Sequence, residues 1–142
     1  MRVAGIRALG EPVEIIEVEE PAPPAAGEVL IDVATAGIGN WDELVRIGSW
    51  QIGGPPPMAL GTSAAGTVAA AGSGVVELRE GDEVMTHPLP LHRHGTWAEK
   101  VLAPAAAGAA RPPEASWEAC CAFPIPALTA AQALDEALGI ES

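Results

Sequence analysis

Histidine and cysteine side chains offer the most direct chemistry in this sequence, because both residue types bind transition metals. The three histidines, His87, His92 and His94, lie within eight positions, and the two cysteines are adjacent to each other further along the chain. Zinc sites need three or four ligands at ~2.0–2.3 Å, usually with a recognisable spacing. No Cys-x-x-Cys or His-Glu-x-x-His pattern occurs here. The spacing therefore favours histidines in a proline-stiffened loop over a metal site.

The adjacent cysteines predict core packing rather than a ligand pair. Neighbouring residues on a helix point ~100° apart, so Cys120 and Cys121 are poorly placed to face one ion. An unpaired cysteine behaves as a small apolar side chain, and Trp117 lies at helical spacing from both of them. Because vicinal cysteines rarely pair with each other, no disulfide is expected, which is typical of a reducing cytoplasm.

Two glycine-containing segments offer further chemistry. The stretch GTSAAGTV at 61–68 could cradle a phosphate, but no lysine follows and the next residues are typical of a strand. A close approach of backbone to backbone or ligand is the better explanation of Gly61 and Gly66. The acidic segment EGDE at 80–83 could supply catalytic carboxylates, although a solvated turn is far commoner in this pattern.

Positioning these residues requires a set of short strands. Sixteen glycines and fourteen prolines predict many turns, which favours a β-rich domain over a helical bundle. Residues 28–38 form the clearest predicted strand, with Val29, Ile31 and Val33 on one face. The other predicted strands cover 1–9, 13–20, 62–75, 83–87 and 95–104, and 51–61 is predicted to be loop.

Three segments have helical character. Residues 40–50 have helical spacing, with Asn40 as the N-cap and Gly48 as the end. Ser116 caps a short helix that contains both cysteines and ends before Pro124 and Pro126. The segment 128–142 is rich in helix-forming residues, and its predicted apolar stripe consists of Leu128, Ala131, Leu134 and Leu138.

Composition narrows the possible partners. The length of 142 residues suits one domain, and nearly half the residues are apolar, so a core can be buried. The net charge of −12 repels phosphate backbones and anionic lipids, so neither nucleic acid nor a membrane is an expected partner. No apolar run is long enough for a transmembrane helix, and the first residues lack the pattern of a signal peptide.

Taken in order, several motifs resemble the N-terminal, GroES-like domain of medium-chain dehydrogenases/reductases. They are GEVLIDVATAGI, NWDELVRIG, LGTSAAGTVAAAGSGV, LREGDEV and GTWAEKVLAP, followed by ASWEACCAFPIPALTAAQAL, which is similar to the passage toward the cofactor domain. The resemblance covers essentially the whole chain. It implies a mainly β fold, a GroES-like partly open barrel with short helices and a C-terminal helix leading toward a Rossmann domain.

The resemblance is strongest to the zinc-free, quinone-oxidoreductase-like branch. Zinc-dependent alcohol dehydrogenases carry a cysteine after the Ala-Gly turn and a Gly-His-Glu motif in the following strand. This sequence has Gly39 and Asn40 in the first region, and Thr62 and Ser63 at the positions of the histidine and glutamate. The four-cysteine lobe of structural zinc is absent as well. The resemblance thus implies NADPH as cofactor, no zinc, and a quinone, enal or enone as the small-molecule substrate.

The resemblance also implies residue roles. Asn40 is expected to contact the nicotinamide or the substrate, although the family's usual asparagine aligns with either Gly39 or Asn40. Thr129 matches a family threonine near the nicotinamide, and His87 or solvent is expected to protonate the product. Leu44 occupies a position where relatives often have tyrosine. The predicted substrate pocket consists of Trp41, Leu44, Trp50, Thr62 and His92, for which ordinary packing or loop exposure is the alternative.

The sequence predicts two parts. Residues 1–125 correspond to the GroES-like domain and 126–142 to the start of a connection to a cofactor domain, whose G-x-G-x-x-G loop does not occur. We expect a catalytic-domain fragment of a cytoplasmic oxidoreductase that is inactive alone. The alternatives are a free-standing module that binds a partner or forms a homodimer, and a zinc-dependent alcohol dehydrogenase.

Overall fold

Two antiparallel sheets form the body of the chain, which a computed structural model describes over residues 1–140. The smaller sheet has the order β2-β1-β4 and consists of Arg2–Ile6 (β1), Glu14–Glu17 (β2) and Met58–Ala59 (β4). The larger sheet has the order β7-β3-β5-β6-β8 and consists of Glu28–Ala36 (β3), Ala64–Ala71 (β5), Glu83–Thr86 (β6), Lys100–Pro104 (β7) and Gly108–Ala110 (β8).

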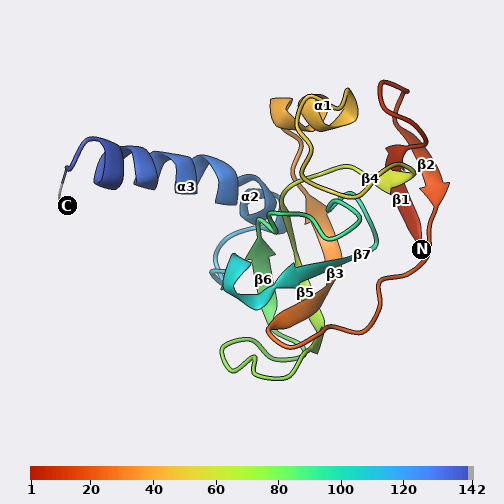
Figure 1. Cartoon of the computed structure of the whole chain (residues 1–142). Coiled ribbons are helices and arrows are strands. Elements are labelled where there is room, and N and C mark those ends of the chain that lie inside the picture. The colour runs from red at the N-terminus through yellow and green to blue at the C-terminus, as the bar shows by residue number, and fades with distance from the viewer. Residues whose placement is uncertain (141–142) are drawn as a thin grey trace.

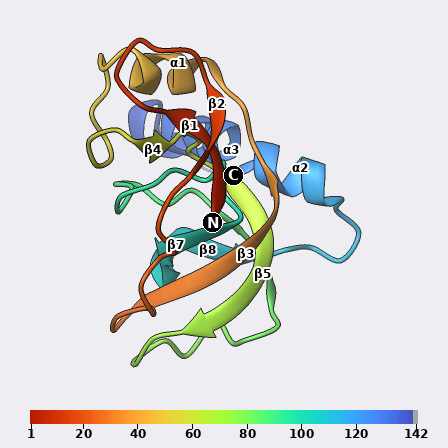
Figure 2. The same cartoon turned by 90° about the vertical axis from the view of Figure 1, so that its right-hand side faces the viewer.

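The larger sheet is strongly curled around β3 and β5, which lie side by side (Figure 2). Their register shifts twice, between Leu30 and Ile31 and between Val33 and Thr35. Such bulges bend a strand and increase its twist, so they give the sheet its half-barrel shape. The predicted mainly β, partly open barrel with short helices is therefore confirmed.

Most predicted strands are present, with differences at 51–61, at 95–104 and at β8, which was not predicted. Residues 51–61, predicted as loop, contain β4, because the prolines end before Met58 and leave Met58 and Ala59 free to pair with β1. The predicted strand 95–104 contributes only Lys100–Pro104 to β7. Its first half turns toward β1, where Ala98 forms a bridge with Val3.

The first helix, α1 (Asn40–Arg46), begins one residue earlier than its predicted cap implies. Gly39, not Asn40, is the N-cap: its backbone is extended, and its N–H donates to the Asp42 carboxylate. The prediction of Asn40 as the cap was wrong because Asp42 supplies the capping oxygen from inside the helix.

The chain leaves the sheets through α2 (Trp117–Ala122), α3 (Pro124–Gln132) and a π-helical turn, η2 (Ala133–Ala137), while the 3-10 turn η1 (Ala105–Ala107) links β7 to β8. Ser116 caps α2 as predicted. Pro124 follows the end of α2 and is the first residue of α3. Proline is tolerated there because the backbone N–H that it lacks has no partner within the helix at that position. Figure 1 shows α3 extending away from the sheets, and α3 crosses the expected boundary at 125–126.

Several small apolar clusters make up the core. The main one lies inside the curled sheet, where Val29, Ile31 and Val68 are completely or almost completely buried. A separate cluster joins the sheet to α2 and contains Cys120 and Cys121 packed near Trp117. The predicted packing role of the cysteines is confirmed, and both thiols are free. The predicted stripe of the C-terminal segment is not part of the core, because α3 and η2 project away from it.

Candidate functional site

A polar cluster of Asp42, Thr62 and His87 lies where three elements end or begin. Asp42 is in the first turn of α1, which follows directly from the β3 strand and the turn 37–39. Thr62 precedes β5, and His87 follows β6. Because β3, β5 and β6 are neighbours in one sheet, their pairing brings these three distant positions together.

Asp42 is a buried carboxylate with one oxygen satisfied. Its side chain is 2% exposed, and Oδ2 accepts a hydrogen bond from the Gly39 N–H at 2.7 Å. Within the described residues, neither Asp42 Oδ1 nor the hydroxyl of Thr62, which is 1% exposed, has a hydrogen-bond partner. Two buried oxygens without partners are uncommon, because each carries the full cost of losing its water.

Burial raises the pKa of Asp42 above its ordinary value of 3.8. The Gly39 N–H, the Thr62 hydroxyl and the Gly61 N–H oppose this rise, so all three lie near the carboxylate. Only the Gly39 contact has the geometry of a hydrogen bond. A nearby dipole lowers the pKa of a carboxyl group without satisfying its oxygen as a hydrogen-bond acceptor.

His87 is linked to the same strand end. Its Nδ1 lies 2.6 Å from the Thr62 carbonyl oxygen, and the side chain is half-buried. A carbonyl oxygen only accepts, so Nδ1 must carry the proton of the neutral ring. This contact fixes the tautomer and leaves Nε2 as the unprotonated nitrogen.

The segment before α1 and the start of β5 are held by the side chains of Thr96, which is buried, and Trp97, which is partly buried. The Thr96 hydroxyl donates to the Ser63 carbonyl at 2.8 Å, and Trp97 Nε1 donates to the Gly37 carbonyl at 2.7 Å. Gly61 has a φ of +94°, and a Cβ there would lie 2.3 Å from the Trp97 ring. The neighbour of Gly61 is thus a side chain, whereas the predicted approach of backbone to backbone occurs at Gly66, where a Cβ would lie 2.1 Å from the Asp32 carbonyl oxygen.

The other predicted site residues are distributed more widely. Asn40 is exposed and Trp41 half-buried, and both adjoin Asp42 in α1. Leu44 is 46% exposed on the same helix. Trp50 packs against the cluster of Ile6, Val45, Met58 and Leu60. Thr129 is exposed on α3.

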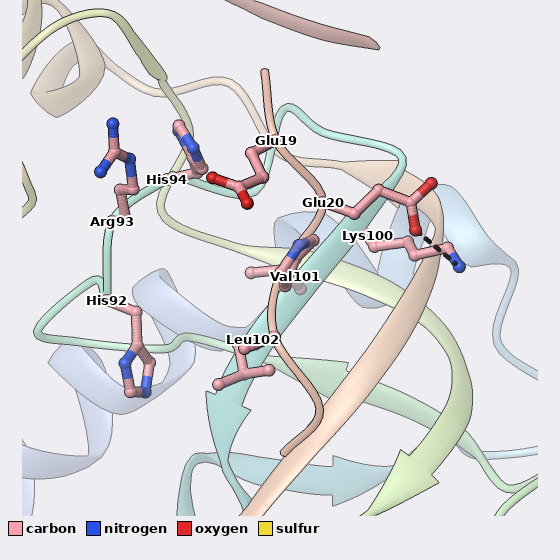
Figure 3. A pocket seen from close by; sticks show the side chains of 10 residues that line it. Glu19, Glu20, His92, Arg93, His94, Lys100, Val101 and Leu102 are labelled. Atoms are coloured by element: carbon pink, nitrogen blue, oxygen red, sulfur yellow. Dashed lines mark ion pairs between the residues drawn. The ribbon is translucent and has the colours of Figure 1, made fainter. Parts of the chain in front are cut away.

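The structure does not bring His92 to the polar cluster. His92 Nε2 lies 2.7 Å from Glu28 Oε1 at the start of β3, whereas Asp42 and Asn40 follow the end of that nine-residue strand. His92 instead lines a cavity of about 360 Å³ together with His94, Lys100 and Glu20. Figure 3 shows this pocket, with Glu20 and Lys100 forming an ion pair. Burial lowers the pKa of His94, with the nearby Arg93 charge adding to the effect.

From the sequence alone, no role was assigned to Asp42. A glycine followed three residues later by an acidic residue is a usable signal for a helix start. Burial of the second carboxylate oxygen beside Thr62 has no local signal, because it depends on the pairing of β3 with β5.

Gly39, Thr62 and Ser63 do not supply zinc ligands. Gly39 offers no side chain, and Thr62 and Ser63 offer neutral hydroxyls where thiolate, imidazole or carboxylate ligands are needed. Across residues 1–140, no three His, Cys, Asp or Glu side chains are grouped as a metal site would require. Over the same range, none of the helices has the length and apolar character needed to cross a membrane.

Comparison with known proteins identifies the fold and the family. Residues 25–113 match the model of the alcohol dehydrogenase GroES-like domain. The synaptic vesicle membrane protein VAT-1 homolog of Rattus norvegicus is 33% identical over 110 residues, covering 78% of this chain and 26% of the relative. The chain spans about a quarter of the length of the curated relatives that it matches.

Solved structures give the same result. An NAD-dependent alcohol dehydrogenase superposes with a TM-score of 0.88 at 32% identity, over 99% of this chain and 48% of that one. The quinone oxidoreductase of Escherichia coli, solved with NADPH, gives a TM-score of 0.77 at 28% identity, over 96% and 40%. The chain therefore belongs to the alcohol dehydrogenase GroES-like domain family of the medium-chain dehydrogenases/reductases.

Proposed function

We propose that this chain is the catalytic-domain portion of a zinc-independent, NADPH-dependent oxidoreductase that reduces a quinone or an enone in the cytoplasm. The observation that carries the proposal is the chemistry of the buried strand start, where Thr62 and Ser63 occupy the positions of the zinc-binding motif of alcohol dehydrogenases. The similarity to a quinone oxidoreductase solved with NADPH supports the cofactor and the substrate class.

The chain's own residues would bind and orient the reactants. NADPH supplies the hydride when it is bound. Asn40 is exposed at the start of α1 and can donate or accept a hydrogen bond toward the nicotinamide or the substrate carbonyl. The buried contacts around Asp42 hold that helix start in place. Thr129 presents a hydroxyl from α3. Solvent returns a proton to the product, either directly or through His87 after Nε2 has taken up a proton from water.

A chimera tests this proposal. The chain is joined to the portion of the E. coli quinone oxidoreductase that its fold does not match, and NADPH oxidation is followed with a panel of quinones and enones. We expect turnover above background that survives chelator treatment, with no stoichiometric zinc in elemental analysis. Asn40→Ala should reduce kcat/KM by about 10-fold or more, whereas the exposed Ser49→Ala should not. The absence of turnover with every quinone and enone in the panel would contradict the proposal.

A second candidate is a module that self-associates or binds a partner. Its support is a series of exposed apolar side chains at the C-terminal end, namely Phe123, Leu128, Leu134, Leu138 and Ile140. Apolar surface of this kind often marks an interface. Sedimentation of the 142-residue chain separates the two ideas: a concentration-dependent dimer that Leu134→Lys and Leu138→Lys abolish favours the module, and a monomer contradicts self-association.

A further inference from the structure

His87 also lines a cavity of about 370 Å³, which lies between the end of β6, the segment 106–109 and the α2–α3 junction. Its walls are apolar: Met85 comes from β6, and Phe123 and Leu128 come from the helical side. The side chain of Phe123 is 57% exposed and that of Leu128 is 50% exposed, so neither belongs to the buried core and both can contact a bound molecule. The volume lies in the range of about 300–1,000 Å³ typical of small-molecule sites.

Polar groups around this cavity are few. His87 is the single ionisable residue among the described residues that line it. The Thr86 hydroxyl also belongs to the lining, but it donates to the Ala107 carbonyl at 3.0 Å. Because His87 Nδ1 already forms a hydrogen bond with the Thr62 carbonyl, Nε2 is the imidazole atom that remains for a hydrogen bond to a ligand. Neutral Nε2 accepts a hydrogen bond and does not donate one.

We infer that this cavity binds a compact, largely apolar molecule with one or two rings and a hydroxyl group, and that His87 Nε2 accepts the hydrogen bond of that hydroxyl. The apolar walls supply most of the contact, and a single polar group sets the orientation. The inference deepens the proposed function and rests on it for the ligand's identity, since reduction of a quinone yields a ring that carries such hydroxyls. It adds to that function the preference for a phenolic over a purely apolar ring.

Binding of 4-methylphenol and toluene to the 142-residue chain isolates the hydroxyl, because the two probes differ by that group alone. Histidine ring signals in NMR titrations report the site. We expect 4-methylphenol to bind about 2–10-fold more tightly than toluene, the range of one net hydrogen bond, and to shift the His87 signals.

The variant His87→Asn is matched to the geometry. An asparagine amide can still donate to the Thr62 carbonyl, so the fold is retained, but it places no acceptor where Nε2 lies. In this variant the preference for 4-methylphenol should disappear while toluene binds as before. His92→Asn is the control, because His92 lines the separate pocket near Lys100 and should leave both affinities unchanged.

Equal affinities of the two probes for the unmodified chain, or a preference that survives His87→Asn, would overturn the inference. This experiment uses neither NADPH nor the chimera, so it can fail or succeed independently of turnover. A preference for phenol without turnover would support the binding inference and contradict the proposed reductase function. Turnover without a preference for phenol would support the reductase function and contradict this role of His87.

Discussion

Replacing Asp42 with asparagine tests whether the buried carboxylate of the polar cluster weakens the fold at neutral pH. The wild-type side chain accepts from the Gly39 N–H through Oδ2, while Oδ1 and the Thr62 hydroxyl have no partners among residues 1–140. Asparagine keeps an oxygen for Gly39 and places an NH₂ donor where Oδ1 was. We expect a small shift of the new side chain to bring this donor to the Thr62 oxygen, so that one substitution satisfies both orphaned groups.

The size of the effect follows from the cost of unsatisfied groups. A buried polar atom without a partner costs about 1–3 kcal/mol, and part of that cost is recovered when a hydrogen bond forms. We therefore expect Asp42→Asn to raise the free energy of unfolding at pH 7 by about 1 kcal/mol, which is roughly 4 °C in Tm for a chain of this size. Asp42→Ala should lower it by about 1–2 kcal/mol, because the Gly39 N–H loses its acceptor.

The contribution of Asp42 to the stability of the fold changes with pH in a direction that follows from its raised pKa. Because the pKa of Asp42 is raised above 3.8 in the fold, the folded chain holds more protons than the unfolded chain between those two pKa values. Wild-type stability contributed by this group therefore falls as pH rises through that interval. Below it, the protonated carboxyl can itself donate to Thr62, and the advantage of asparagine should shrink toward zero.

Urea denaturation followed by the fluorescence of the four tryptophans measures these differences at pH 7 and at pH 3.5–4. Asp32→Asn serves as the control, since Asp32 is exposed on β3 and should change stability little at either pH. The reasoning is refuted if Asp42→Asn destabilises the chain at pH 7 as much as Asp42→Ala does. That result would mean that the carboxylate is charged and fully satisfied.

Four further substitutions test the elements around the site, each by thermal denaturation. Ser116→Ala should cost about 1 kcal/mol, because the Ser116 hydroxyl accepts the Ala119 N–H at the start of α2; an unchanged Tm would show that the cap is unimportant. Gly61→Ala should cost about 3 kcal/mol, because the added Cβ meets Trp97 in a left-handed backbone. Gly74→Ala, with the same sign of φ and open space, should cost only about 1 kcal/mol, and equal losses would contradict the packing argument. Arg111→Lys should cost about 1–2 kcal/mol, since Arg111 donates to Glu83 and to the Ala115 carbonyl and lies 4.7 Å from the Trp117 ring centroid; a neutral result would remove that anchoring role.

Local patterns were sufficient for most of the strands and for the packing of the cysteines. Val29, Ile31 and Val33 alternate with Leu30, Asp32 and Ala34, so they share one apolar face of a strand, because the side-chain period of a strand is two. The Ser116 cap is likewise decided by neighbouring residues, because its hydroxyl accepts the free N–H of Ala119. The order of motifs was sufficient for the family.

Tertiary structure decided which polar residues meet. His87, His92 and His94 are close in sequence, yet the loop sends His87 to the Thr62 carbonyl and His92 to Glu28, because β6 and the start of β3 lie in different parts of the curled sheet. Asp42 lies in the first turn of a helix, where an acidic residue is common. Only the pairing of β3 with β5 buries its second oxygen beside Thr62. These contacts join residues that are far apart in the sequence, so the spacing of residues does not predict them. The register of the paired strands determines which residues lie beside each other.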